Sequence, residues 1–339
     1  MNDKAPDGER PLVSFCMVCY NGARYVRAAL QSILDQTYDP LEIVVCDDCS
    51  TDGTDRIVAE MLDDYRRGGG GHEVRFRRNE SNLGILRNYE QCFRMGRGEL
   101  LVTGSHDDIQ MPDRVERTVD AWVRGGRKAG LVICGMRCID EEGKFLYDSR
   151  PWGKVSALGA ASAYVRAVAE GFPALERNDA AYEDHVFSAR AVMFGPELLI
   201  DEPLFMYRRG SGPSTPRGFR MQRTRITRHV MESLALSESD LRFARDVLRP
   251  PRLKEAEELV EKRRRRFTPE YRLVTGRTVG ERWRGYRGLC PGNGWNLGWR
   301  MKAFYYLPLV LPFHIGDAVT ALYEIYGKAR KRMRKCRRF

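Results

Sequence analysis

Short apolar runs alternate with stretches of helical periodicity along the N-terminal half of the chain. The runs at 12–19, 41–46, 73–78, 99–104 and 130–136 have the length and composition of strands. Between them, apolar residues recur every three or four positions, which predicts helices. The predicted helical stripes are Val26, Leu30, Ile33 and Leu34; Ile57, Val58, Met61, Leu62 and Tyr65; Tyr89, Cys92 and Phe93; and Val115, Val119, Trp122 and Val123. This alternation predicts an α/β fold with a mostly parallel, Rossmann-like sheet and helices on both faces.

The C-terminal third has a different pattern. From about residue 216 it consists of arginine-rich helical segments such as "RLKEAEELVEKRRRRF". The segment 303–326 is aromatic and apolar, but it falls short of the roughly 18 uninterrupted apolar residues of a spanning helix. The residues that interrupt it are Pro308, Pro312, His314 and Asp317. We expect a segment that lies in the membrane interface, followed by a polybasic tail; a packed helix with a solvated tail is the alternative.

Composition places most of the positive charge in that tail. The chain has 339 residues, 42% of them hydrophobic, and a formal net charge of +11. Its last twelve residues hold eight Lys or Arg and no acid, so the rest of the chain carries only +3. Such a tail can bind anionic lipid or nucleic acid. Because no basic-aromatic module appears inside the fold, we expect an anionic membrane surface as the partner and no nucleic acid.

The cysteines pose an alternative of their own. Cys16 and Cys19, with Cys46 and Cys49, have the spacing of a zinc site. Residues three apart in an extended strand point to opposite faces, so we predict packed cysteines instead.

The first residues, "MNDKAPDGERPL", contain no apolar core, so we expect neither a signal peptide nor a membrane span there. Nine cysteines without such a signal indicate a reducing, cytoplasmic compartment.

Acidic residues close two of the predicted strands. Asp47 and Asp48 end the second strand, where they are able to accept hydrogen bonds from a base or a ribose. Helix capping by Ser50 or Asp52 is the alternative interpretation. Because ligands of parallel sheets bind beyond the carboxyl ends of the strands, the acids indicate a shared site at one sheet edge.

A second acidic pair, Asp107 and Asp108, follows the fourth strand in "GSHDDIQMPDR". A diphosphate beside bare carboxylates would be repelled, so binding one there requires a bridging cation. Mn²⁺ or Mg²⁺ takes oxygen ligands and keeps positions for phosphate oxygens. A capped turn before Pro112 is the alternative.

The third acidic pair, Glu183 and Asp184, lies in the first turn of a predicted helix that Gly195 ends. The helix dipole favours anions at that position, so simple dipole matching explains the pair. A carboxylate that abstracts a hydroxyl proton fits equally well. A dinucleotide-dependent oxidoreductase is disfavoured, because the first strand leads into "CYNGARYV" with no G-x-G-x-x-G.

Together these segments resemble the family 2 glycosyltransferases, which have the GT-A fold. The stretch "PLVSFCMVCYNGARYVRAALQSILDQTYDPLEIVVCDDCSTDGT" is similar to the N-terminal signature of that family. "NLGILRNYEQCFRMGRGELLVTGSHDDIQMPDRVE" resembles the stretch that leads into its Asp-x-Asp motif. "EDHVFSARAVMFG", followed by "EPLFMYRRGSGPS", resembles its acceptor half. The resemblance covers about residues 11 to 215.

The resemblance implies a nucleotide-sugar donor, a divalent cation and transfer to an acceptor hydroxyl with inversion. It implies that Asp48 contacts the nucleotide base with support from Asp47, that Asp184 is the general base and that Glu183 lies beside it. The implied donor-binding residues are Tyr20, Asn21, Asp47, Asp48, Asn82, Arg87, Asp107, Arg208 and Arg209, and the implied metal-site residues are Asp107, Asp108 and His106.

Three positions depart from the family pattern. Ser105 replaces the first acid of Asp-x-Asp, so we expect a weaker metal site or a contribution from His106. Val18 stands where relatives often have Thr, which removes one base contact. Many relatives have a His after the "YR" element, where this chain has Arg209; the sequence "RRGSGPS" predicts a cationic closing loop over phosphate instead.

The resemblance and the pattern together give the expected organisation and function. We expect a flexible N-terminus at 1–10 and a GT-A domain at 11–215, with a nucleotide-binding half at 11–110 and an acceptor half at 111–215. A helical extension that is able to associate with a membrane should follow at 216–326, and the polybasic tail at 327–339. The implied enzyme is an inverting glycosyltransferase, with a UDP-sugar favoured and a glycan or lipid-linked acceptor. We expect it in cell-surface polysaccharide or lipopolysaccharide biosynthesis, at the inner face of the plasma membrane. The alternative is a non-catalytic nucleotide-sugar-binding protein of the same fold.

Overall fold

The computed structural model describes residues 10–151, 153, 158–176, 182–210 and 219–289. The predicted interfacial segment 303–326 and the tail 327–339 lie outside these residues. The chain divides into two compact units. The first runs to Pro213 and includes Ser233–Val260; the second comprises Ser214–Glu232 and the chain from Glu261 onward.

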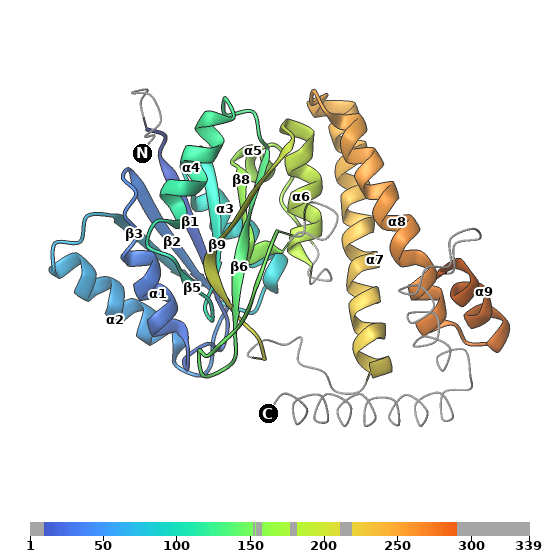
Figure 1. The fold of residues 1–339 in the computed structure, drawn as a ribbon, viewed down its shortest axis with the longest axis horizontal. Helices are drawn as coiled ribbons and strands as arrows, with labels where there is room; N and C mark the ends of the chain where they lie inside the picture. The colour runs from blue at the N-terminus through green and yellow to red at the C-terminus, as the bar shows by residue number, and fades with distance from the viewer. Residues whose placement is uncertain (1–9, 152, 154–157, 177–181, 211–218, 290–339) are drawn as a thin grey trace, which may run out of the picture. The chain divides into compact units, whose positions relative to one another are not determined.

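The first unit is built on one sheet. Within the described residues this sheet has nine strands in the order β3-β2-β1-β4-β8-β6-β9-β5, with β7 paired to β6 (Figure 1). The strands are β1 (Val13–Cys19), β2 (Leu41–Asp47), β3 (Glu73–Arg78), β4 (Leu100–Ser105), β5 (Ile109–Gln110), β6 (Leu131–Ile139), β7 (Phe145–Ser149), β8 (Ser162–Val165) and β9 (Glu197–Arg208).

The two halves of the sheet differ in strand direction. Strands β3, β2, β1 and β4 are parallel throughout. Beyond β4, strand β8 is antiparallel to both β4 and β6, β6 is parallel to β9, and β5 and β7 are antiparallel to their partners. The predicted α/β fold is confirmed, and its parallel character belongs to the first half. The second half is mixed because antiparallel neighbours require no crossover helix.

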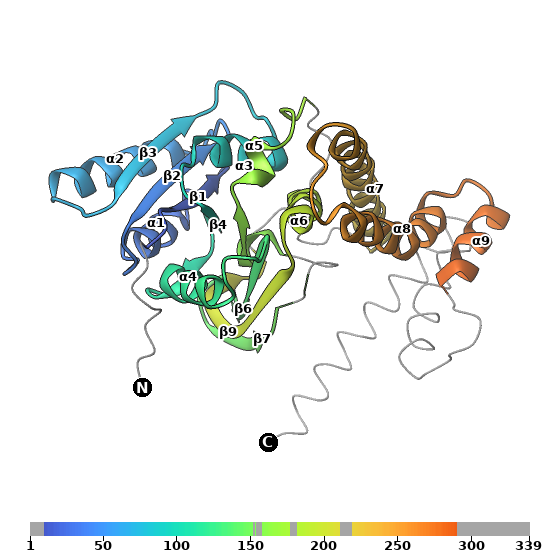
Figure 2. The same ribbon diagram turned by 90° about the horizontal axis from the view of Figure 1, so that it is seen from above.

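Helices cover both faces of the sheet, as predicted (Figure 2). On one face, α1 contacts α2 and β5, and α4 contacts β6 and β9. On the other face, α3, α5 and α6 contact one another. There α3 packs on β1 and β2, and α6 packs on β6 and β8. The helices are α1 (Val26–Leu34), α2 (Thr54–Arg67), α3 (Ile85–Met95), α4 (Arg114–Arg124), α5 (Ala167–Glu170), α6 (Glu183–Phe194), α7 (Phe219–Phe243), α8 (Leu253–Thr275) and α9 (Val279–Leu289).

The core follows the predicted stripes. The apolar face of α1 is buried together with Ala29, and β1 and β2 are buried along their whole length. Cys16 and Cys19 occupy buried positions of β1, and Cys46 lies on β2, so these thiols are core residues. A strand buried on both faces explains why the runs at 12–19 and 41–46 are nearly free of polar residues.

A buried ion pair joins α6 to the part of α7 that belongs to the first unit. Arg190 is fully buried and donates from Nε and Nη2 to the two carboxylate oxygens of Asp240, at 2.7 and 3.1 Å. Its Nη1 donates to the carbonyl oxygen of Val168 at 3.1 Å and lies 3.7 Å from Oε1 of Glu90. The guanidinium also lies over the Phe172 ring, 4.5 Å from its centroid. The pair fixes α7 to α6 of the first unit at Asp240.

The second unit contains the arginine-rich helical segments. Helices α7 and α8 contribute residues to both units, and α9 belongs to the second. The predicted helical character of the chain after residue 216 is therefore confirmed as far as residue 289. No helix in the described part of the chain is both long enough and apolar enough to cross a bilayer.

Candidate active site

The carboxyl ends of β1 and β4 meet where the strand order reverses. From β1 the chain proceeds to β2 and β3 and then returns to β4 on the other side of β1. The strand register places Val18 opposite Ser105 and Cys19 opposite Asp47. Open α/β sheets bind ligands beyond the carboxyl strand ends at such a reversal. The predicted residues that follow these three strands therefore share one edge.

Asp47 organises the turn that follows β2. Its buried carboxylate accepts hydrogen bonds from the Ser50 backbone N–H at 2.8 Å and from the Ser50 hydroxyl at 2.5 Å. Burial raises the pKa of Asp47, and the hydrogen bonds from Ser50, together with the charge of Arg78, offset part of the rise. The observed contacts of Asp47 thus support the β2–α2 turn, and its role toward a nucleotide stays a prediction.

Asp48 holds the segment that precedes α3. Its Oδ1 accepts hydrogen bonds from Asn79 Nδ2 at 2.9 Å and from the Leu83 N–H at 2.7 Å, while Oδ2 accepts one from the Gly84 N–H at 2.9 Å. Asn82, exposed, accepts a bond from the same Gly84 N–H at 3.0 Å. The carboxylate predicted to meet the base therefore positions the loop that leads to Arg87. Asp48 is able to accept these three hydrogen bonds and a further one from a nucleotide base, because a carboxylate has more than three acceptor positions.

The loops after β1 and β2 are joined by hydrogen bonds between them. The Thr51 N–H donates to the side-chain oxygen of Asn21 at 2.9 Å, and the Gly22 N–H donates to the Thr54 hydroxyl at 2.8 Å. Asn21 has a positive φ of 48°, which asparagine tolerates better than most residues. Tyr20, next to it, is 46% exposed. The side chain of Asn21 thus serves loop structure, and Tyr20 offers an open ring at the sheet edge.

The Ser105–Asp108 segment contains one accessible and one buried acid. The Ser105 hydroxyl donates to Asp107 Oδ1 at 2.6 Å, which orients a half-buried carboxylate. Asp108 is 1% exposed, and its Oδ1 accepts a hydrogen bond from the Arg208 N–H at 2.9 Å. Burial and then the charge of Asp107 raise the pKa of Asp108 well above its usual value. His106 lies against Gly22, where a Cβ atom would stand 2.1 Å from the imidazole Cδ2.

These residues fit a cation held chiefly by one side chain. Asp107 supplies the hard carboxylate oxygen that Mn²⁺ and Mg²⁺ prefer. No cluster of three or more His, Cys, Asp or Glu side chains that could hold a metal occurs among the described residues. A cation at Asp107 would accordingly take most of its remaining ligands from water and diphosphate. The roles predicted for Asp108 and His106 remain predictions.

The two arginines at the carboxyl end of β9, Arg208 and Arg209, differ in their surroundings. The Arg208 side chain donates to the carbonyl oxygens of Asp107, Asp140 and Glu141 at 3.0, 3.1 and 2.9 Å, and its guanidinium lies 4.7 Å from the centroid of the Tyr25 ring. Arg208 therefore ties the metal-motif loop to the β6–β7 turn and to the segment before α1.

Arg209 is exposed and donates to the hydroxyl of Tyr147 on β7. Its backbone N–H bonds the Ile139 carbonyl oxygen at 2.9 Å. Of the two arginines, Arg209 is the more accessible to an anionic ligand. Tyr25 and Tyr147, which orient the two arginines, were missed by sequence reasoning, because nothing local distinguishes them from other surface aromatics.

The third acidic pair begins α6. Asp184 is buried, and Glu183 lies against Gly159, where a Cβ atom would stand 2.3 Å from Glu183 Oε1. Burial, followed by the charge of Asp184, raises the pKa of Glu183 well above its usual value. Burial, followed by the charge of Glu183, raises the pKa of the Tyr89 hydroxyl well above its usual value.

Comparisons with known proteins indicate which family the chain resembles. Residues 14–172 match the sequence model of glycosyl transferase family 2. An uncharacterized glycosyltransferase of Rickettsia bellii is 33% identical over 143 residues, which are 42% of this chain and 19% of that protein. Alignments with the curated relatives cover 19% to 46% of their lengths, so the chain spans less than half of each.

Two solved structures share the fold. The mannosyltransferase PcManGT from Pyrobaculum calidifontis, solved with GDP-Man and Mn²⁺, is similar with a TM-score of 0.56 over 95% of this chain and 90% of that chain, at 18% identity. S. aureus TarS 1–349, solved with UDP-GlcNAc, has a TM-score of 0.55 over 82% of this chain and 79% of its own, at 15% identity. At such identities the likeness concerns the fold alone. Residues 14–172, just under half of the chain, are thus similar to the family 2 glycosyltransferases, and the fold of the chain is GT-A.

Proposed function

We propose that the protein moves a sugar from a nucleoside-diphosphate sugar to a hydroxyl of a glycan or lipid-linked acceptor, with inversion at the anomeric carbon. The observation that carries the proposal is the strand register at the reversal point, which gathers the ends of β1, β2 and β4 at one edge. Support comes from the two structures of this fold, which contain GDP-Man and UDP-GlcNAc. From the family resemblance, a UDP-sugar is the favoured donor.

The buried acidic pair of α6 supplies the base. Two carboxyls at this distance from water do not both ionise easily, so the pair retains one proton near neutral pH. Burial and the charge of Asp184 raise the pKa of Glu183, which favours the proton on Glu183, and we take Asp184 as the base. Asp184 accepts the proton of the acceptor hydroxyl, whose oxygen attacks the anomeric carbon while the nucleoside diphosphate departs. A single in-line displacement of this kind inverts the configuration.

The leaving diphosphate needs positive charge. Asp107 would hold the divalent cation, and Arg209 would add a guanidinium, a group suited to bidentate contact with phosphate. When bound, Mn²⁺ or Mg²⁺ supplies Lewis acidity to the diphosphate oxygens. Asp48 orients the loop before α3 against the nucleotide.

Calorimetric binding of UDP, GDP, dTDP and CDP, each with Mn²⁺ and then with EDTA, tests the donor site. One nucleotide that binds only with metal, and more weakly to Asp107→Asn, is the expected result. Transfer is then assayed with Asp184→Asn, which should lower kcat by 10² or more while leaving nucleotide affinity unchanged. Nucleotide binding without turnover by the unmodified protein would favour a non-catalytic nucleotide-sugar-binding protein, an alternative that Ser105 keeps open.

The cellular setting belongs to the same proposal. We place the enzyme in the cytoplasm, peripheral on the inner face of the plasma membrane, in polysaccharide or lipopolysaccharide assembly. The tail 327–339 provides the polybasic anchor, since each Lys or Arg near an anionic leaflet adds about 1 kcal/mol. Partitioning of the full chain with membranes at low but not at high salt is the expected behaviour.

A further inference from the structure

The α8–α9 hairpin of the second unit is strongly basic. Residues 261–289 contain ten Lys or Arg and only three acids. This excess is separate from the C-terminal tail and lies on ordered helices. A folded surface that carries more positive charges than its acidic residues neutralise indicates an anionic partner.

The hairpin has a fixed geometry. Gly285 allows α9 to approach α8 closely, since a Cβ atom there would lie 2.5 Å from the Leu273 N and 2.7 Å from the Pro269 carbonyl oxygen. Arg282 is 3% exposed, and its Nη1 donates to the Gly276 carbonyl oxygen at 3.0 Å across the turn. The arginines on this hairpin are therefore carried on a preformed turn.

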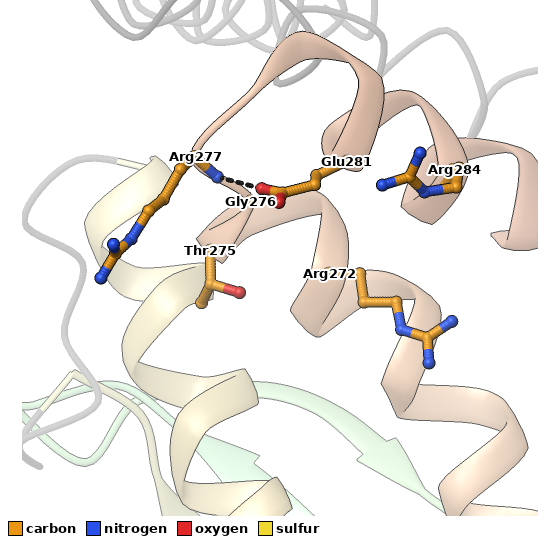
Figure 3. A pocket seen from close by; sticks show the side chains of 6 residues that line it. All are labelled: Arg272, Thr275, Gly276, Arg277, Glu281 and Arg284. Atoms are coloured by element: carbon orange, nitrogen blue, oxygen red, sulfur yellow. Dashed lines mark hydrogen bonds between the residues drawn. The ribbon is translucent and has the colours of Figure 1, made fainter.

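A cavity of about 470 Å³ opens at that turn (Figure 3). Its lining residues are Arg272, Thr275, Gly276, Arg277, Glu281 and Arg284. Glu281, the one acid among them, accepts hydrogen bonds from the Arg277 N–H at 2.7 Å and the Thr278 N–H at 3.2 Å. These backbone bonds, with Thr278 first, hold the pKa of Glu281 below its usual range. Glu281 and Thr278 thus cap the start of α9 through reciprocal hydrogen bonds, and three of the six lining residues are arginines.

Apolar side chains are exposed on the same helix. Val279 is 50% exposed and Trp283 is 45% exposed. Positions four apart lie on one helix face, so the two form a short apolar strip on α9, next to Arg284. The Trp283 ring stacks on Tyr286, with centroids 5.4 Å apart. Tryptophan beside arginines on an amphipathic helix is typical of segments that lie at a membrane interface.

We propose that the α8–α9 hairpin binds the phosphate groups of anionic phospholipids at a membrane surface. Arg272, Arg277 and Arg284 contact the phosphates, and Val279 and Trp283 enter the interface. The apolar strip favours lipid over nucleic acid, because an aliphatic valine offers no stacking surface for a base. The proposal is independent of the glycosyltransferase activity and concerns a different part of the chain from the tail.

Co-sedimentation of the full chain with vesicles tests the hairpin. The vesicles are phosphatidylcholine alone or with 30% phosphatidylglycerol, a composition chosen as roughly that of an anionic leaflet. The test variant is Arg272→Gln/Arg277→Gln/Arg284→Gln, and the matched control is Arg56→Gln/Arg124→Gln/Arg242→Gln, three exposed arginines of the first unit. Both variants keep the tail and lose the same charge, so the tail cannot account for a difference between them. Circular dichroism checks that both remain folded.

The test variant should bind anionic vesicles on the order of 100-fold more weakly, at about fivefold per arginine near the surface. The control should lose much less. Trp283→Ala should weaken vesicle binding and leave any binding of inorganic phosphate unchanged, which separates a membrane surface from a free-phosphate site. Equal losses in test and control variants would overturn the proposal. It would also be overturned if the hairpin variants lost affinity for a single-stranded RNA and kept their affinity for vesicles.

Discussion

Replacing Asp240 by asparagine removes the charge that pairs with Arg190 and keeps the shape of the side chain. Breaking a buried ion pair from one side costs about 3–5 kcal/mol, because the other charge is left in the interior. Oε1 of Glu90 remains 3.7 Å from Arg190 Nη1 and still offsets part of the charge. We therefore expect a loss of about 3 kcal/mol, the lower end of that range. The midpoint of thermal unfolding should then fall by about 6–12 °C.

The two partners should respond differently to pH. Arginine cannot lose its proton inside a protein, whereas burial raises the pKa of Asp240, so that carboxyl is able to become neutral. In Arg190→Met the folded-state pKa of Asp240 lies above its unfolded value. The folded state of the variant is then favoured at low pH, and the variant loses stability as the pH rises through that pKa. The Arg190→Met variant should be less destabilised at pH 5 than at pH 8.

Urea and thermal unfolding, followed by circular dichroism, measure these differences. Asp246→Asn, an exposed acid close to Asp240 in the sequence, is the matched control and should change stability by less than about 0.5 kcal/mol. The double variant Arg190→Met/Asp240→Leu should recover most of the lost stability, because two apolar groups leave no buried charge. If Asp240→Asn behaves like the control, the assignment of a buried, energetically coupled pair is wrong.

Three further predictions concern the site. Glu183→Gln places a neutral amide where the raised pKa of Glu183 favours a neutral carboxyl, so the acid limb of the kcat/KM profile should stay where it is in the unmodified protein; a displaced limb would mean that Glu183 is charged beside the base. Gly22→Ala should displace His106 and weaken nucleotide binding at least tenfold in calorimetry, since a Cβ would lie 2.1 Å from the imidazole. Ser105→Asp restores a second acid, and Mn²⁺ should bind about tenfold more tightly by titration with nucleotide present; equal affinity would mean that position 105 does not face the metal.

Much of the first half of the sheet could be predicted from the sequence. The runs at 12–19 and 41–46 are apolar except for Ser14 and Glu42, and β1 and β2 occupy these positions. The α1 stripe has one clear helical period. The acids that follow β2 and β4 could also be placed at one edge, because parallel strands bring their carboxyl ends together.

The second half of the sheet could not be predicted in the same way. The segment Glu197–Arg208 was interpreted through its family motif, and the structure shows it as strand β9, the parallel neighbour of β6. Its burial does not alternate regularly, and charged residues interrupt the apolar ones. Strand pairing across the sheet depends on distant partners, which local periodicity does not contain.

The hydrogen-bond partners of individual side chains could not be predicted from the sequence either. Asp48 bonds three groups between Asn79 and Gly84, and Arg208 bonds three carbonyl oxygens on two loops. Arg190 and Asp240 are fifty positions apart. Each contact depends on tertiary approach, so a motif could indicate the residue and not its partners.

The joined loops after β1 and β2 have a consequence for redesign. Asn21 and Thr51, like Gly22 and Thr54, belong to different loops but share hydrogen bonds. A chimera that replaces 20–23 with the loop of a relative would leave the Thr51 N–H, which donates, and the Thr54 hydroxyl, which accepts, facing foreign partners. Transplanting both loops as one cassette preserves every bond between them, so altered donor preference is best sought by exchanging the two together.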